Sequence, residues 1–164
     1  MPLPSGTILI VADNAQGKSN LLEGIYMLSI GKSHRARKES EMMRSNSLTN
    51  ANYCKVSADI DNGGKRTKIQ IFFESRPGPS IVKTATQKYV RINGVPKKSA
   101  DIVGIFNAVL FTASDLDLIY GSPSLRRKYI DILLSQVSKE YLDALRIYQK
   151  SLSQRNHLLR KIRE

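Results

Sequence analysis

A short Gly-Lys-Ser segment places the strongest constraint on the fold of this chain. Residues 12–19 read Ala-Asp-Asn-Ala-Gln-Gly-Lys-Ser, which fits the phosphate-loop pattern Gly-x-x-x-x-Gly-Lys-Ser/Thr except at its first position. The apolar run 7–11 before it predicts a short buried strand. Leucines and isoleucines at helical spacing then predict a helix from about residue 17 to residue 30, closed by Gly31 in a left-handed conformation. This order favours a phosphate-binding loop over a chance tripeptide at a helix start.

The residue types in the segment suit the binding of a nucleotide. Amides at a helix N-terminus attract anions, and Gly17 lets the backbone pass close to phosphates because it has no Cβ. Lys18 would contact the β- and γ-phosphates, and the Ser19 hydroxyl would ligate Mg²⁺. Ala12 in place of glycine predicts at worst a weakened or rearranged loop. The residues predicted to bind ATP are Ala12, Asp13, Asn14, Ala15, Gln16, Gly17, Lys18, Ser19 and Asn20.

The middle of the chain has the period of antiparallel strands. Val56, Ala58 and Ile60 alternate with polar residues, as in a half-buried strand. A return strand and an Asn-Gly hairpin follow, so an antiparallel meander is inserted after the first helix. Its predicted parts are a strand at 55–60, a turn at 61–64, a strand at 65–74, a loop at 75–79 and a hairpin at 89–95.

The last third is predicted to be mainly helical. Residues 108–111 read as another buried strand, and Ser122-Pro123 begins a helix that runs through Leu134. A second helix starts near Ser138. Its apolar residues follow a heptad, which favours packing on neighbouring helices over a coiled coil because few heptads are present. They are Tyr141, Leu145, Tyr148, Leu152, Leu159 and Ile162.

Charge is the most informative bulk property. Lys and Arg number 26 against 14 Asp and Glu, a net charge of +12 spread along the chain. Such a field concentrates polyanions, and it favours contact with nucleic acid over a merely solvated basic surface. The apolar fraction of 41% is sufficient for a packed core. Cys54 is the single cysteine, the run 7–11 is too short to cross a bilayer, and the opening residues do not resemble a signal peptide. We therefore expect a cytoplasmic protein without membrane contact.

Several ordered segments resemble the RecF family. Residues 13–26 resemble the family's phosphate loop with its Asn-Leu-Leu-Glu continuation, and residues 31–35 resemble its Gly-Arg-Ser-Phe-Arg segment. Residues 90–94 resemble its hairpin. Two further matches, at 110–131 and 141–156, extend the resemblance over nearly the whole chain.

The resemblance implies an α/β fold of the P-loop NTPase type: an ABC/SMC-like head lobe at 1–121 with the antiparallel insertion, and the start of a helical lobe at 122–164. RecF proteins are ATPases of recombinational repair and replication restart that join the response to DNA damage. The family's properties imply ATP-dependent binding to single-stranded, gapped or junction DNA, recombinase loading with other Rec proteins, and homodimerisation around ATP. Candidate DNA-binding residues are Arg35, Arg37, Lys38, Arg126 and Arg127.

The sequence also departs from the family. Ala12 and Ala15 replace loop glycines, and residues 112–114 differ from the usual Ser-Pro-Glu. No Walker B or signature motif is found, so we expect an incomplete lobe that lacks turnover of its own. Two alternatives stay open: a non-enzymatic basic DNA-binding module with a degenerate loop, and a P-loop metabolite kinase, which the antiparallel insertion disfavours.

Overall fold

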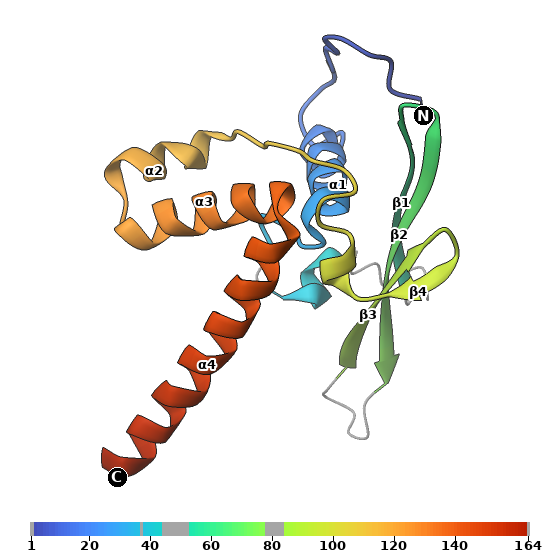
Figure 1. The fold of residues 1–164 in the computed structure, drawn as a ribbon. Coiled ribbons are helices and arrows are strands. Elements are labelled where there is room, and N and C mark those ends of the chain that lie inside the picture. The colour runs from blue at the N-terminus through green and yellow to red at the C-terminus, as the bar shows by residue number, and fades with distance from the viewer. Residues whose placement is uncertain (1, 37, 44–52, 78–83, 164) are drawn as a thin grey trace.

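A computed structural model describes residues 2–36, 38–43, 53–77 and 84–163. It places helix α1 (Lys18–Ile30) between an antiparallel sheet and a layer of helices (Figure 1). The sheet follows chain order: β1 (Tyr53–Asn62), β2 (Lys65–Pro77), β3 (Thr84–Ile92) and β4 (Val95–Lys97). The helices are α2 (Asp117–Tyr120), α3 (Pro123–Val137) and α4 (Lys139–Arg163). Short 3-10 turns lie at Glu39–Met42, Ser99–Asp101 and Ala113–Leu116.

The sheet confirms the predicted antiparallel meander. The glycine pair 63–64 has positive φ at both residues and forms the two-residue turn between β1 and β2. The Asn-Gly pair 93–94 does the same between β3 and β4, with φ of 51° and 81°. The loop predicted from residue 75 is wrong at its start, because β2 continues to Pro77 opposite Thr84. Cross-strand pairing therefore extends further than the turn-forming residues of 75–79 indicate.

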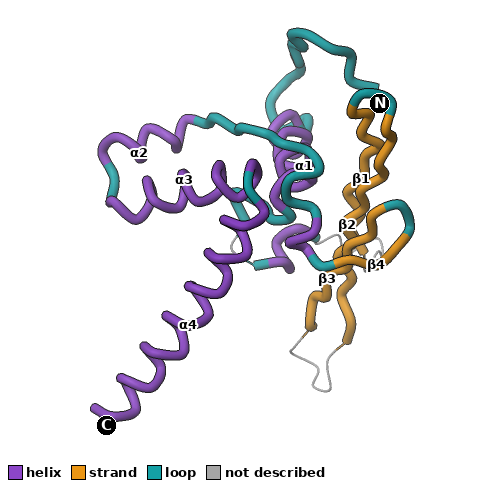
Figure 2. The backbone as a smooth tube through the Cα atoms, in the orientation of Figure 1, coloured by secondary structure: helices purple, strands orange, loops and turns teal. Residues whose placement is uncertain are grey.

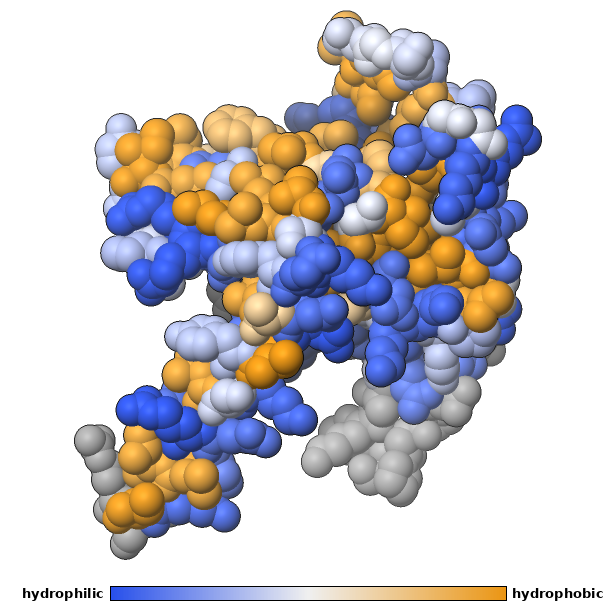
Figure 3. Space-filling view, in the orientation of Figure 1, coloured by the Kyte–Doolittle hydropathy of each residue, from blue (hydrophilic) through white to orange (hydrophobic). Residues whose placement is uncertain are grey.

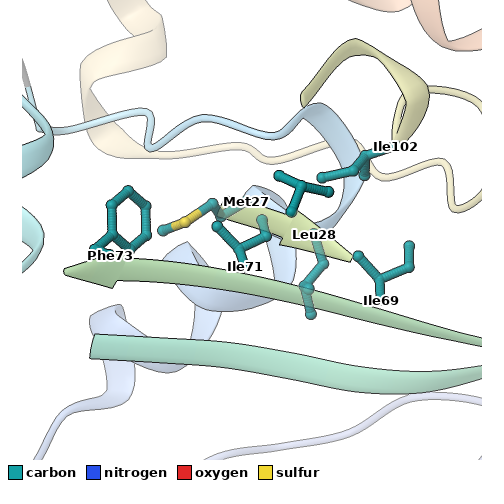
Figure 4. Packing of buried hydrophobic residues seen from close by; sticks show 7 residues of the cluster. Met27, Leu28, Ile69, Ile71, Phe73 and Ile102 are labelled. Carbon is teal, nitrogen blue, oxygen red and sulfur yellow. The ribbon is translucent and has the colours of Figure 1, made fainter. Parts of the chain in front are cut away.

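The core lies between α1 and the inner face of the sheet. Apolar side chains from α1, β2 and β3 meet there, joined by one residue after the turn at Ser99–Asp101 (Figure 4). The helix stripe predicted from leucines and isoleucines is only partly correct, since Leu22 is 47% exposed whereas Met27 is fully buried. The buried residues are Met27, Leu28, Ile69, Ile71, Phe73, Val90 and Ile102.

The C-terminal end of α1 is fixed to the sheet. Gly31 has φ of 72°, and its amide donates to the Met27 carbonyl at 2.8 Å, which confirms the predicted cap. A Cβ on Gly31 would lie 2.9 Å from the Ser99 carbonyl oxygen. The Lys88 ammonium donates to the Gly31 carbonyl and lies 3.7 Å from the Glu39 carboxylate. Burial lowers the pKa of Lys88, and Glu39 opposes this shift.

Helix α3 begins at the predicted place. Pro123 is its first residue, and Ser122 has the extended backbone of an N-cap. The Ser122 hydroxyl, however, bonds the Ser124 hydroxyl at 2.6 Å, so no side-chain cap is made. The helix continues beyond the predicted end at Leu134 to Val137.

Helix α4 packs on α3 near its start and then projects away from the body (Figure 1). The helix starts next to Ser138, near the predicted place, and the Ser138 hydroxyl caps it by accepting a bond from the Tyr141 amide at 3.1 Å. Packing on neighbouring helices was predicted for the whole heptad stripe, but in the described residues it holds only near Tyr141. Farther along, Tyr148 and Ile162 are 62% and 78% exposed. None of the described helices combines the length and apolar character needed to span a bilayer.

The two predicted core strands are not formed. Residues 7–11 and 108–111 are extended loop (Figure 2), and Leu9, Val11 and Phe111 are 73–85% exposed. Hydrophobic side chains reach the surface over the upper part of the molecule (Figure 3). A buried strand needs neighbours that pair its amides and carbonyls. No described strand runs beside either segment, so the apolar sequence alone does not produce a strand.

We expect Ile71→Ala to lower the free energy of unfolding by about 2–5 kcal/mol, because the substitution leaves a cavity in a fully buried position. Val109→Ala should lower it by less than about 0.5 kcal/mol, because Val109 is 69% exposed. Urea unfolding followed by circular dichroism measures both values. Equal losses would show that 108–111 is buried after all.

Gly31→Ala should lower the free energy of unfolding by about 1–3 kcal/mol, since a left-handed alanine is strained and its Cβ would press on the Ser99 carbonyl. Gly63→Ala is the matched control. It carries a similar φ of 62°, but nothing lies within 4 Å of its Cβ position. The same urea titration should give the larger loss for Gly31→Ala, and a larger loss for Gly63→Ala would contradict the close approach.

Candidate phosphate-binding site

The predicted phosphate loop lies at the N-terminal end of α1. Gly17 comes immediately before the helix and is left-handed, with φ of 86° and ψ of 11°. Ala15 is also left-handed, with φ of 65°, whereas Ala12 has no positive φ. The alanine at the first position of the pattern is therefore compatible with the backbone conformation there. The strain falls on Ala15, where a Cβ costs about 1–2 kcal/mol.

The Lys18 side chain folds back over the loop. Its ammonium donates to the Ala12 carbonyl at 2.5 Å and to the Asp13 carbonyl at 2.7 Å. A lysine ammonium has three donors, so these two bonds leave one for another acceptor. The loop thus holds a positive charge beside its own backbone, next to the helix N-terminus.

The N-terminus of α1 is open to an anion. The helix has no side-chain cap and no acidic residue in its first turn. Its ladder starts with the Leu21 amide, which donates to the Gly17 carbonyl at 3.0 Å, so the preceding amides have no acceptor within the helix. Nothing lies within 4 Å of a Cβ position on Gly17, and the Ser19 and Asn20 side chains are exposed. Free amides, a nearby ammonium and an exposed hydroxyl fit a phosphate with its Mg²⁺.

A second group of polar residues flanks the loop along α1. The Ser33 hydroxyl donates to the buried Glu23 carboxylate and accepts bonds from the Arg35 and Ala36 amides at 3.0 and 2.8 Å. The Arg35 guanidinium lies 3.9 Å from the other Glu23 oxygen. Glu23, Arg35 and Ala36 border a hollow of about 530 Å³ that Asn20 also lines. The sequence interpretation did not assign Glu23 or Ser33, although both stand in the quoted motifs.

Of the predicted DNA-binding residues that the structure describes, two follow α1 and two lie on α3. Arg35 pairs with Glu23 beside the loop, and Lys38 is exposed. Arg126 donates to two carbonyls at the end of α2, at 3.0 and 3.3 Å, which gives it a structural contact. Arg127 is exposed on α3. Arg37 lies outside the described residues.

Comparison with known proteins gives a consistent result. No protein-family model matches the chain. "DNA replication and repair protein RecF" of Clostridium novyi (strain NT) is 40% identical over 162 residues, which cover 98% of this chain and 41% of that protein. The proteins of the same name from Shouchella clausii (strain KSM-K16) and Chloroflexus aurantiacus (strain ATCC 29364 / DSM 637 / Y-400-fl) are 38% and 35% identical, over 95% and 100% of this chain.

The chain spans about two fifths of the length of these relatives, with 41%, 38% and 43% covered in the three cases. The similarity nevertheless runs through nearly all of the chain's own residues, including the loop, the sheet and the helices. The resemblance indicated by the motifs is thereby confirmed, and the chain is similar in sequence to part of the DNA replication and repair protein RecF.

Proposed function

We propose that residues 12–20 bind the triphosphate of ATP together with Mg²⁺. The observation that carries the proposal is the Lys18 ammonium, held over the loop by two carbonyls beside an uncapped helix N-terminus. Such a site supplies several hydrogen-bond donors and a positive charge. A phosphate matches both, because it carries negative charge and several acceptor oxygens.

Each group in the site has a separate role. The free amides of the first turn of α1 would donate to phosphate oxygens, and Lys18 would leave its backbone carbonyls for the β- and γ-phosphates. The Ser19 hydroxyl would ligate Mg²⁺, which neutralises part of the phosphate charge. Gly17 leaves open space for the phosphates to approach.

We further propose that the nucleotide controls binding to DNA. The net charge of +12 favours a polyanion, and the relatives are named for DNA replication and repair. The RecF resemblance supports single-stranded or gapped DNA as the ligand, a role in recombinational repair and replication restart, and help in recombinase loading with other Rec proteins. It also supports an ATP-dependent homodimer of the whole protein.

A second candidate function rests on Ala15. A left-handed alanine strains the loop, and a loop that no longer binds ATP would leave a basic module that binds DNA alone. The two candidates differ in whether ATP changes the affinity for DNA.

Lys18→Ala should weaken Mg·ATP binding about 10- to 100-fold, because it removes a charge-assisted bond to phosphate. Lys32→Ala is the matched control, since it removes the same charge from an exposed lysine beyond the other end of α1 and should leave affinity unchanged. Calorimetric titration measures the affinity, and circular dichroism checks the fold. Equal affinities for Lys18→Ala and the wild type would refute the proposed site.

Affinity for a single-stranded oligonucleotide should fall steeply with salt. The logarithm of the binding constant should fall with the logarithm of the salt concentration, with a slope of about 0.7 for each phosphate contacted. Under the leading proposal, Mg·ATP raises this affinity in the wild type and has no effect in Lys18→Ala. Fluorescence anisotropy at several salt concentrations tests both points. If Mg·ATP does not change the affinity of the wild type for the oligonucleotide, the second candidate, a basic module that binds DNA alone, would be favoured.

A further inference from the structure

The outer face of the sheet carries three aromatic side chains on adjacent strands. Phe72 of β2 stands opposite Tyr89 of β3 in the pairing register, and Tyr53 lies two residues before the β1 partner of Phe72. Since side chains alternate along a strand, all three lie on the face opposite the core. Tyr53 is 66% exposed and Tyr89 is 39% exposed. The rings therefore form a row across the sheet that no described element covers.

Cationic side chains surround this row. The Lys55 ammonium lies 5.4 Å from the centroid of the Phe72 ring, and the Arg91 guanidinium lies 5.6 Å from it. Both cations are exposed. Such contacts hold the long side chains beside the rings, so the positive charge stays on the aromatic part of the face.

The aromatic part of the face borders a hollow. A hollow of about 760 Å³ is lined by the three aromatic residues, Arg91, Lys97 and Lys98 among others, with Glu74 the one acidic residue on its lining. Toward the β1–β2 turn the cations are paired instead: Lys68 lies 4.0 Å from Asp59, and Arg66 lies 3.8 Å from Asp61. The charges of Lys55 and Arg91 on this face thus lie beside the rings.

We propose that this face binds single-stranded DNA by stacking bases on Tyr53, Phe72 and Tyr89, with Lys55 and Arg91 contacting the phosphates. Aromatic rings that alternate with cations on a sheet suit unpaired bases, because every base has a face that can stack and a phosphate that needs a counter-charge. A duplex keeps its bases stacked on one another and could use only the cations. The inference rests on the proposed DNA binding and adds the surface and the form of DNA.

The test measures binding of the full 164-residue chain to a labelled 20-nucleotide oligothymidine and to a duplex of equal length, by fluorescence anisotropy. Tyr89→Leu should weaken binding to the single strand about 5- to 150-fold. Tyr89→Phe should retain affinity, because the ring remains. The matched control is Tyr148→Leu, an exposed tyrosine on α4, which should change nothing. Tyr53→Leu repeats the test at a more exposed position, where folding is not at risk.

The charge and the location are tested separately. Lys55→Gln and Arg91→Gln should each reduce the salt slope by about 0.7. A photo-reactive oligonucleotide should cross-link to β1, β2 or β3 in a peptide map.

The outcomes separate the two proposals. If the wild type binds no DNA, the proposed function fails and this inference fails with it. If the wild type binds the single strand while Tyr53→Leu and Tyr89→Leu bind it equally well, only the sheet face is ruled out. Loss of duplex binding as severe as loss of single-strand binding, or tighter binding of oligouridine than of oligothymidine, would also overturn the assignment.

Discussion

The packing of α1 on the sheet is the contact on which the rest of the structure depends. Met27 and Leu28 close the core from the helix side, and Gly31 lets the chain leave the helix against the Ser99 carbonyl. At this end the half-buried Lys88 donates to the Gly31 carbonyl. The opposite end of the same helix is open, uncapped and solvated. One helix is therefore anchored at its C-terminus so that its N-terminus can present free amides.

The sheet, like α1, has one packed side and one open side. Its inner face packs against α1, and Ile69, Ile71 and Phe73 are buried there. Its outer face carries aromatic and cationic side chains that are not part of the core. Because side chains alternate along each strand, the residues of the outer face can vary without disturbing the inner one. The predicted phosphate loop and the outer face are thus separate surfaces that share one core.

Sequence reasoning predicted the local elements better than the environment around them. The helix after the loop, its Gly31 cap and both hairpins were correct because each depends on nearby residues: glycine or asparagine at positive φ, and apolar residues at a fixed spacing. The strands at 7–11 and 108–111 were wrong because strand formation needs partners that a local pattern cannot supply. The motif predicts a phosphate loop before α1, but the left-handed Ala15 and the Glu23–Ser33 contact depend on how the chain folds back on α1.

Helix α4 has a mechanical consequence. Its 25 residues, at about 1.5 Å of rise each, make a rod roughly 37 Å long that contacts the body only near its start. It joins α3 through a single extended residue, Ser138, with φ of −133° and ψ of 119°. A turn of about 10° at that joint would move the far end of such a rod by roughly 6 Å. Small changes in the angle between α3 and α4 would thus produce large displacements at the far end of α4.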